Sequence, residues 1–165
     1  MKTSANKITP RMFYDHAIRR EYMSGVSREK SRVKATGEVF TPDGLVVEIL
    51  ERLHRMDKEL FTDPKKTFID PSAGDGQFLA HAMLMKIVGG DMTKLKDKKF
   101  MRTNIADEYW MHLKTIYGID LMPDNVKLIR ARLGMGEPRF DSILKNNIRC
   151  ENALTYDFSF TPEEQ

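Results

Sequence analysis

The sequence predicts a single α/β domain built around a short parallel sheet. Three observations predict this fold class: strand-like and helical segments alternate along the chain, the strand-like segments are short and apolar, and glycine or proline separates them. At 165 residues the chain is long enough for one domain with its own hydrophobic core. Its hydrophobic content of 41% and charged content of 31% are ordinary for a globular protein.

The first 36 residues are predicted to form a basic N-terminal arm, and residues 37–165 the sheet domain. The arm holds nine Lys and Arg residues and three acidic residues, so its net charge is +6 and the remaining 129 residues sum to −3. A basic arm on a mildly acidic body is typical of proteins that contact the phosphates of DNA. A solvated basic helix without a ligand would have the same composition, and charge alone does not separate the two interpretations.

Within this arm, residues 8–24 are predicted to be helical, with Met12, Ile18 and Tyr22 on the apolar face. Residues 25–36 are rich in polar and charged side chains and are predicted to form an exposed linker.

The next predicted helix begins in the stretch TPDG. Thr41 is suited to cap the helix, Pro42 occupies the first helical position, and Asp43 complements the positive end of the helix dipole. The apolar residues that follow fall on one helical stripe. They are Leu45, Val46, Ile49, Leu50 and Leu53.

Strands and helices alternate in the rest of the chain. The predicted strands are Thr67–Ile69, Thr115–Ile119 and Ile148–Cys150. The predicted helices are residues 77–88, residues 105–114 and a helix that follows Met122-Pro123-Asp124 and ends at Leu133, with a lysine-rich surface insertion at residues 89–103. Parallel α/β sheets bind ligands at the carboxyl ends of their strands, so functional side chains are expected there.

The stretch DPSAGDGQFL places a glycine-rich loop between the first strand and its helix. Gly74 and Gly76 flank Asp75, so a ligand could approach bare backbone and the N-terminus of the following helix. The loop differs from the dinucleotide fingerprint, because Leu79 occupies the position of the third glycine. The next strand-end acid, Asp120, also comes far later than that fingerprint requires, so a pyrophosphate site is not predicted.

Two aspartates close two successive strands: Asp70 the first and Asp120, in YGIDLMPDN, the second. Carboxylates at these positions suit the ammonium group and the ribose hydroxyls of S-adenosylmethionine, and glycine amides suit its methionine carboxylate. Each aspartate alone could instead be an N-cap or turn residue. Their joint occurrence beside a glycine loop favours a cofactor site.

Four motifs resemble, in order, those of amino-methylating DNA methyltransferases, most closely the adenine-N6 enzymes of type I and type IIG restriction–modification systems. DPSAGDGQFL resembles the cofactor loop of that family, GEVFTP (residues 37–42) its first cofactor motif, YGIDLMP its second-strand motif, and IRCENAL (residues 148–154) its third-strand motif. The likeness covers about residues 34–155. It implies a truncated Rossmann-like methyltransferase fold, S-adenosylmethionine as cofactor, and transfer of a methyl group to the adenine amino group in DNA.

The resemblance implies a role for each matching residue. Phe40 and Thr41 would border the methionine end of the cofactor, Asp120 would bind the ribose hydroxyls, and Leu121 would lie against adenine. Asn152 stands where the family has an aspartate that accepts a hydrogen bond from the adenine amino group. The residues that would hold the methionine moiety are Asp70, Ser72, Gly74 and Gly76.

The tetrapeptide on which the chemistry of this family depends is missing. It consists of Asn or Asp, two prolines and an aromatic residue; its carbonyls accept the hydrogens of the adenine amine, and its ring stacks on the flipped base. The seven prolines of this chain include no adjacent pair, so no catalytic residue is predicted and the isolated chain is expected to be inactive. Three interpretations stay open: a fragment of a longer enzyme, a subunit completed by a protein partner, or a non-catalytic S-adenosylmethionine-binding module that regulates a methyltransferase.

Neither a membrane nor a metal is expected. No apolar run approaches the roughly 18 residues of a membrane span, and the N-terminus lacks the apolar region of a signal peptide. The single Cys150 excludes an internal disulfide, which suits the cytoplasm. The four histidines lack the spacing of metal ligands.

Overall fold

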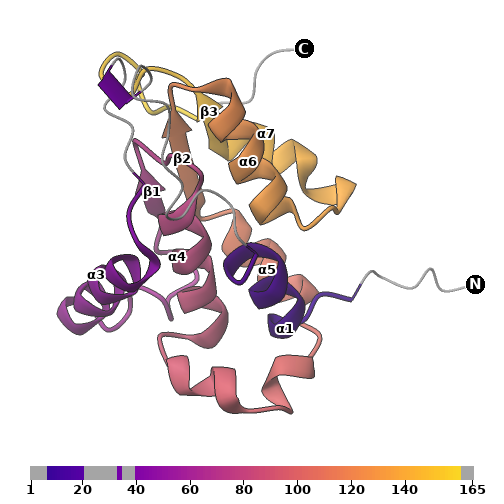
Figure 1. Cartoon of the computed structure of the whole chain (residues 1–165). Coiled ribbons are helices and arrows are strands. Elements are labelled where there is room, and N and C mark those ends of the chain that lie inside the picture. The colour runs from indigo at the N-terminus through magenta and orange to yellow at the C-terminus, as the bar shows by residue number, and fades with distance from the viewer. Residues whose placement is uncertain (1–6, 21–32, 35–39, 161–165) are drawn as a thin grey trace, which may run out of the picture.

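The structure is a computed structural model that describes residues 7–20, 33–34 and 40–160. In this part of the chain helices flank a three-stranded parallel sheet, which confirms the predicted α/β class (Figure 1). The strands are β1 (Phe68–Asp70), β2 (Ile116–Asp120) and β3 (Ile148–Cys150). The helices are α1 (Pro10–Phe13), η1 (Tyr14–Ile18, a π-helix), α3 (Asp43–Met56), α4 (Gln77–Val88), η2 (Met92–Lys96), η3 (Phe100–Arg102), α5 (Ala106–Leu113), α6 (Pro123–Gly134), η4 (Pro138–Phe140) and α7 (Asp141–Asn147).

The strands lie in the order β1-β2-β3 and all run parallel. Asp70 is paired with Gly118, and Asp120 with Cys150, so the carboxyl ends of the strands meet at one edge of the sheet. The predicted strands are confirmed: β3 has the predicted bounds, and β1 and β2 lie one residue further along the chain than predicted.

Helix α4 is the centre of the hydrophobic core. All of its residues except Phe78 are buried, because β1, β2, α3, α5 and the N-terminal helices pack around it. Gly118 of β2 allows α4 to approach the sheet, since a Cβ at that position would lie 2.5 Å from Leu79 Cδ1. The predicted end of α4 is confirmed at Gly89, which adopts the left-handed conformation of a helix C-cap.

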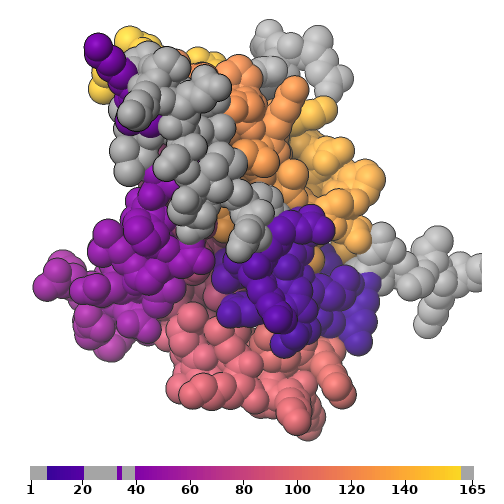
Figure 2. All heavy atoms as spheres, viewed as in Figure 1, coloured from indigo at the N-terminus to yellow at the C-terminus, as the bar shows by residue number. Residues whose placement is uncertain are grey.

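The N-terminal residues pack into this core, and the predicted helix face is wrong at Met12. Residues 10–18 form α1 and η1, in which Phe13 and Ala17 are fully buried, Ile18 packs against the core and Met12 is 45% exposed. Residues 21–24 of the predicted helix, Tyr22 among them, lie outside the described residues. The Phe13 ring lies 5.6 Å from that of Tyr109 in α5. Figure 2 shows this segment, in indigo, against the body of the molecule. Sequence periodicity missed this face because α1 and η1 span only nine residues and change helical period between them.

The local details before α3, in residues 89–103 and at α7 compare with the prediction as follows: one prediction is wrong, one is confirmed and one helix was missed. Thr41 does not cap α3; Pro42 is the N-cap, its carbonyl accepts from the amides of Leu45 and Val46, and no side chain bonds the helix end. The segment 89–103, predicted as a surface insertion, is mostly exposed and contains η2 and η3. Helix α7 was not predicted, because the glycines and the proline before it are typical of a turn.

Candidate ligand-binding site at the strand ends

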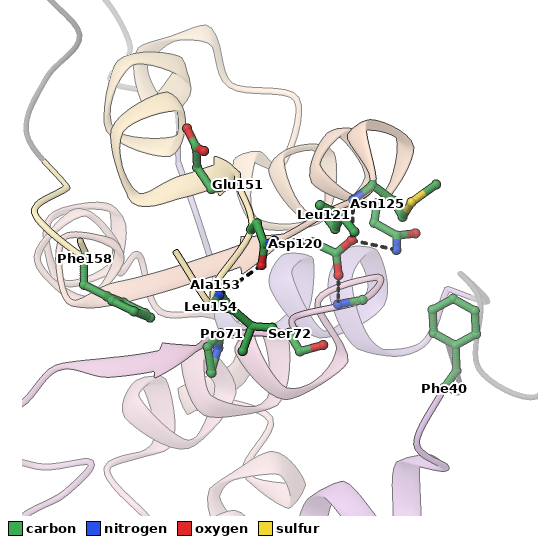
Figure 3. Close-up of a pocket in the computed structure, with 13 residues that line it drawn as sticks. Phe40, Pro71, Ser72, Asp120, Leu121, Asn125, Glu151, Ala153, Leu154 and Phe158 are labelled. Carbon is green, nitrogen blue, oxygen red and sulfur yellow. Dashed lines mark hydrogen bonds between the residues drawn. The ribbon is translucent and has the colours of Figure 1, made fainter. Parts of the chain in front are cut away.

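A cavity of about 640 Å³ opens at the carboxyl ends of the three strands (Figure 3). We call it the strand-end pocket. Its walls come from the residue Phe40 before α3, the glycine loop after β1, the turn from β2 into α6, and the segment that follows β3. Its volume lies within the range of small-molecule binding sites.

Asp120, which is 7% exposed, is the central polar group of this pocket. Its Oδ2 accepts a 2.8 Å hydrogen bond from the Gly74 amide, and its Oδ1 accepts bonds from the Met122 amide (2.9 Å) and Asn125 Nδ2 (3.0 Å). These bonds converge on one carboxylate in Figure 3. A carboxylate has about four lone-pair sites, so roughly one remains for a ligand. Asp120 therefore has the capacity to accept from one ribose hydroxyl rather than from both.

Gly74 and Gly76 are required by the backbone of the loop. Their φ angles of 54° and 82° lie in the left-handed region. A Cβ on Gly76 would lie 3.0 Å from Ile129 Cγ1, and a Cβ on Gly74 would lie 3.4 Å from the Phe40 ring. Both amides donate within the protein, that of Gly74 to Asp120 and that of Gly76 to a loop carbonyl. The glycines therefore shape the loop, and their amides are already engaged.

Asp70 ends β1 next to the pocket but does not line it. Its Oδ1 accepts a 3.0 Å hydrogen bond from the Ser72 amide. Burial raises the pKa of Asp70, the charge of nearby Asp120 raises it further, and the bond from Ser72 acts in the opposite direction. Because the charge of Asp120 disfavours ionisation of Asp70, this end of the sheet favours a positively charged ligand over a negatively charged one.

The structure brings six of the nine predicted cofactor residues together in the lining of the pocket. These are Phe40, Ser72, Gly74, Asp120, Leu121 and Asn152. Three lie outside the lining: Asp70 at the end of β1, Gly76 at the end of the glycine loop, and Thr41 beside Phe40.

Leu121 and Asn152 differ in how available they are to a ligand. Leu121 is 59% exposed and presents an apolar surface at the mouth of the pocket. Asn152 is exposed, and its Oδ1 accepts a 3.0 Å bond from the Leu154 amide. Its second lone pair is the acceptor that an adenine amino group could use.

Sequence reasoning missed part of the lining. Asn125 could have been found from the sequence, because it is a polar residue five positions after Asp120 on the first turn of a predicted helix. In the structure it is 1% exposed. No sequence signal marked Phe158. Its ring packs against that of Phe160, which in turn lies 4.8 Å from the ring of Tyr117 in β2. The other lining residues that were not predicted are Pro71, Met122, Glu151, Ala153 and Leu154.

The predicted basic arm is described only in part. Arg11 forms a 2.7 Å ion pair with Asp15, and Arg19 lies 3.7 Å from the same carboxylate. The predicted linker lies outside the described residues except for positions 33 and 34, and the predicted domain boundary at residue 36 lies outside them altogether.

Within the described residues, no group of three or more His, Cys, Asp and Glu side chains is placed to hold a metal ion. Nor does any helix of the described part have the length and apolarity needed to cross a membrane. Comparisons with protein-family models, curated protein sequences and solved structures find no match for this chain.

Proposed function

We propose that the strand-end pocket binds S-adenosylmethionine and that the chain is the cofactor-binding part of a DNA adenine-N6 methyltransferase. One observation carries the proposal. Asp120 at the end of β2 accepts a hydrogen bond from the glycine loop after β1, and its carboxylate lines the pocket with a lone-pair site left to accept a hydrogen bond from a ligand. This arrangement suits a ligand with a hydroxyl-bearing ribose and a compact cationic end.

The charge of the site supports S-adenosylmethionine over a nicotinamide or flavin dinucleotide. The carboxylates of Asp70 and Asp120 would repel a pyrophosphate, whereas they attract the sulfonium and ammonium groups of S-adenosylmethionine. The amides of Gly74 and Gly76 are engaged within the protein, so they form neither the cradle of free amides that a pyrophosphate uses nor a site for the methionine carboxylate, and the charge of the two aspartates is what separates the ligands.

The shape of the pocket also supports an elongated ligand. Phe40 and Phe158 lie at opposite ends of it in Figure 3, with Asp120 between them. The pocket has an aromatic or apolar wall at each end and hydrogen-bond acceptors in the middle. This arrangement matches a ligand that carries adenine at one end, the methionine chain at the other, and a ribose between them.

Methyl transfer to adenine requires a group that this sequence does not contain. The chain has no adjacent prolines, so we propose that the catalytic tetrapeptide comes from polypeptide outside these 165 residues, and that DNA is bound by the complete assembly in the cytoplasm. The same observation favours a second candidate function: a non-catalytic S-adenosylmethionine-binding module that regulates a methyltransferase.

Calorimetric titration tests the first step of the proposal. S-adenosylmethionine should bind the purified chain with one site, and NAD at the same concentrations should not. Binding of NAD instead would reject the proposal. Transfer of tritium from labelled S-adenosylmethionine to adenine-containing DNA should be absent with the chain alone. Co-purification from the source organism separates the two functions: a partner that carries the tetrapeptide and restores transfer supports a divided enzyme, and capture of an already active methyltransferase supports a regulator.

A further inference from the structure

A buried polar cluster lies outside the strand-end pocket and joins the glycine loop to the N-terminal helices. Its centre is Arg132 of α6, which is 1% exposed. Arg132 Nε donates to the Ala17 carbonyl at 2.6 Å, and Nη2 donates to Gln77 Oε1 at 2.6 Å. Nη1 donates to the carbonyl and to the carboxylate of Asp75, each at 3.3 Å. One guanidinium therefore contacts the N-terminal segment, the glycine loop and the start of α4.

Gln77 extends the cluster to a fourth segment. Its side-chain nitrogen donates to Asp43 Oδ1, at the first turn of α3. Three residues before Asp43, the Phe40 ring packs against Gly74 and lines the pocket. Hence the wall of the pocket before α3 and the glycine loop are both connected to Arg132.

The guanidinium suits this position because it is planar and always charged, and its donors have a fixed arrangement. A buried charge is costly unless it is paired and hydrogen-bonded, and here an ion pair with Asp75, which is 1% exposed, and three neutral acceptors satisfy it. A bonded set of this kind favours one arrangement of the segments around it, because any displacement leaves a buried donor unsatisfied.

The N-terminal segment reaches the cluster by packing as well. Ala17 is fully buried, and η1 contacts both α4 and α6. Figure 1 shows α1 beside α5 and below the end of α6. The carbonyl that Arg132 binds is thus fixed by the hydrophobic contacts of residues 8–18, not only by the hydrogen bond.

We propose that Arg132 is a positioning residue that couples the docking of residues 8–18 to the geometry of the glycine loop, so that ligand affinity at the strand-end pocket depends on a segment that does not line it. The inference rests on the proposed function only for the identity of the ligand. A substitution at Arg132 should loosen the N-terminal segment and the glycine loop together.

The test compares Arg132→Lys with a matched control, Asn147→Ala. Asn147 is also 1% exposed, and its side chain donates to carbonyls of Leu113, Lys114 and Ile116 at the opposite end of β2. Amide hydrogen exchange of residues 9–19 and 73–77 should accelerate at least tenfold in both segments for Arg132→Lys, and in neither for Asn147→Ala. The Kd for S-adenosylmethionine should rise at least tenfold for Arg132→Lys and stay within twofold for Asn147→Ala.

Folded Arg132→Lys protein with unchanged exchange in either segment would overturn the coupling. If Arg132→Lys does not fold, Gln77→Leu replaces it, because that change removes the acceptor of Nη2 and the contact to Asp43 but keeps the pair with Asp75. It should shift exchange and affinity in the same direction, by threefold to tenfold. If the wild-type chain binds no S-adenosylmethionine, the proposed function fails, and the exchange measurements still decide the coupling.

Discussion

The backbone amide of Gly74 donates a 2.8 Å hydrogen bond to the carboxylate of Asp120, although 46 residues separate them in the chain. The bond joins the loop after β1 to the end of β2. Because parallel strands end at the same edge of a sheet, two segments distant in sequence meet there and form one pocket. The same carboxylate that would bind a ligand therefore also holds the loop that surrounds it.

Asp120→Asn is expected to weaken both the loop and the ligand. An asparagine amide accepts through one oxygen only and directs its NH₂ group at a donor, so it cannot keep all three bonds from Gly74, Met122 and Asn125. Hydrogen bonds to a charged group contribute about 1.5–3 kcal/mol, so urea unfolding should show a loss of this size. Calorimetry should show S-adenosylmethionine binding about ten- to a hundredfold more weakly.

Asp107→Asn is the control for Asp120→Asn, since Asp107 is an exposed carboxylate in the first turn of α5 and the change in charge is the same. It should leave the ligand affinity within twofold of wild type. Equal affinity of wild type and Asp120→Asn would remove Asp120 from the site.

Asp70→Asn is expected to stabilise the protein at neutral pH and to weaken the binding of S-adenosylmethionine. Burial and the charge of Asp120 raise the pKa of Asp70 in the folded protein, so folding favours the neutral carboxyl over the ionised one. The stability that comes from this preference is complete below the ordinary pKa of about 3.9 and is lost as the pH rises through the raised pKa. Asparagine keeps the acceptor for the Ser72 amide without the charge. The urea midpoint of the variant should exceed that of wild type at pH 7, with no difference near pH 3.

Asp91→Asn tests the sign of the pH dependence of stability, because the pKa of Asp91 is shifted in the opposite direction to that of Asp70. Hydrogen bonds from Thr93 lower the pKa of Asp91, so its contribution to stability is present above pH 4 and is lost as the pH falls. Asp91→Asn should therefore not raise the urea midpoint at pH 7. If Asp70→Asn lowered that midpoint instead, the raised pKa of Asp70 would be refuted.

Gly118→Ala is expected to destabilise the fold by overpacking. The added Cβ would lie 2.5 Å from Leu79 Cδ1 and 3.3 Å from Ile148 Cδ1, so the fully buried side chain of Leu79 would have to change its position within the packed core. Overpacking of a core costs about 1–3 kcal/mol, measurable as a fall in the free energy of unfolding. Gly44→Ala is the matched control: no atom lies within 4 Å of the added Cβ in α3, and stability should stay constant or rise by about 0.5 kcal/mol.

The strands and the central helix α4 were predictable because their signals are local. Short apolar runs bounded by turn residues identified β1, β2 and β3 to within one residue, and Gly89 marked the end of α4. The packing of Phe13 and Ala17 was not predictable, because a segment of nine residues has too few positions to show a period.

The candidate site was predictable where a residue follows a strand. Asp120 and Gly74 were identified in this way, and both line the pocket. The contributions of Arg132 and Phe158 were not predictable, because Arg132 bonds the distant carbonyl of Ala17, and Phe158 packs against Phe160, whose ring contacts Tyr117 of β2. Asp75 was conspicuous in the sequence, but it is turned into the buried cluster instead of the pocket.

A crystal structure of the chain grown with S-adenosylhomocysteine tests the central claim most directly. We expect electron density in the strand-end pocket, with one ribose hydroxyl within hydrogen-bond distance of Asp120 and the adenine ring against Leu121. An empty pocket at saturating ligand, or a ligand bound elsewhere on the molecule, would contradict the proposal.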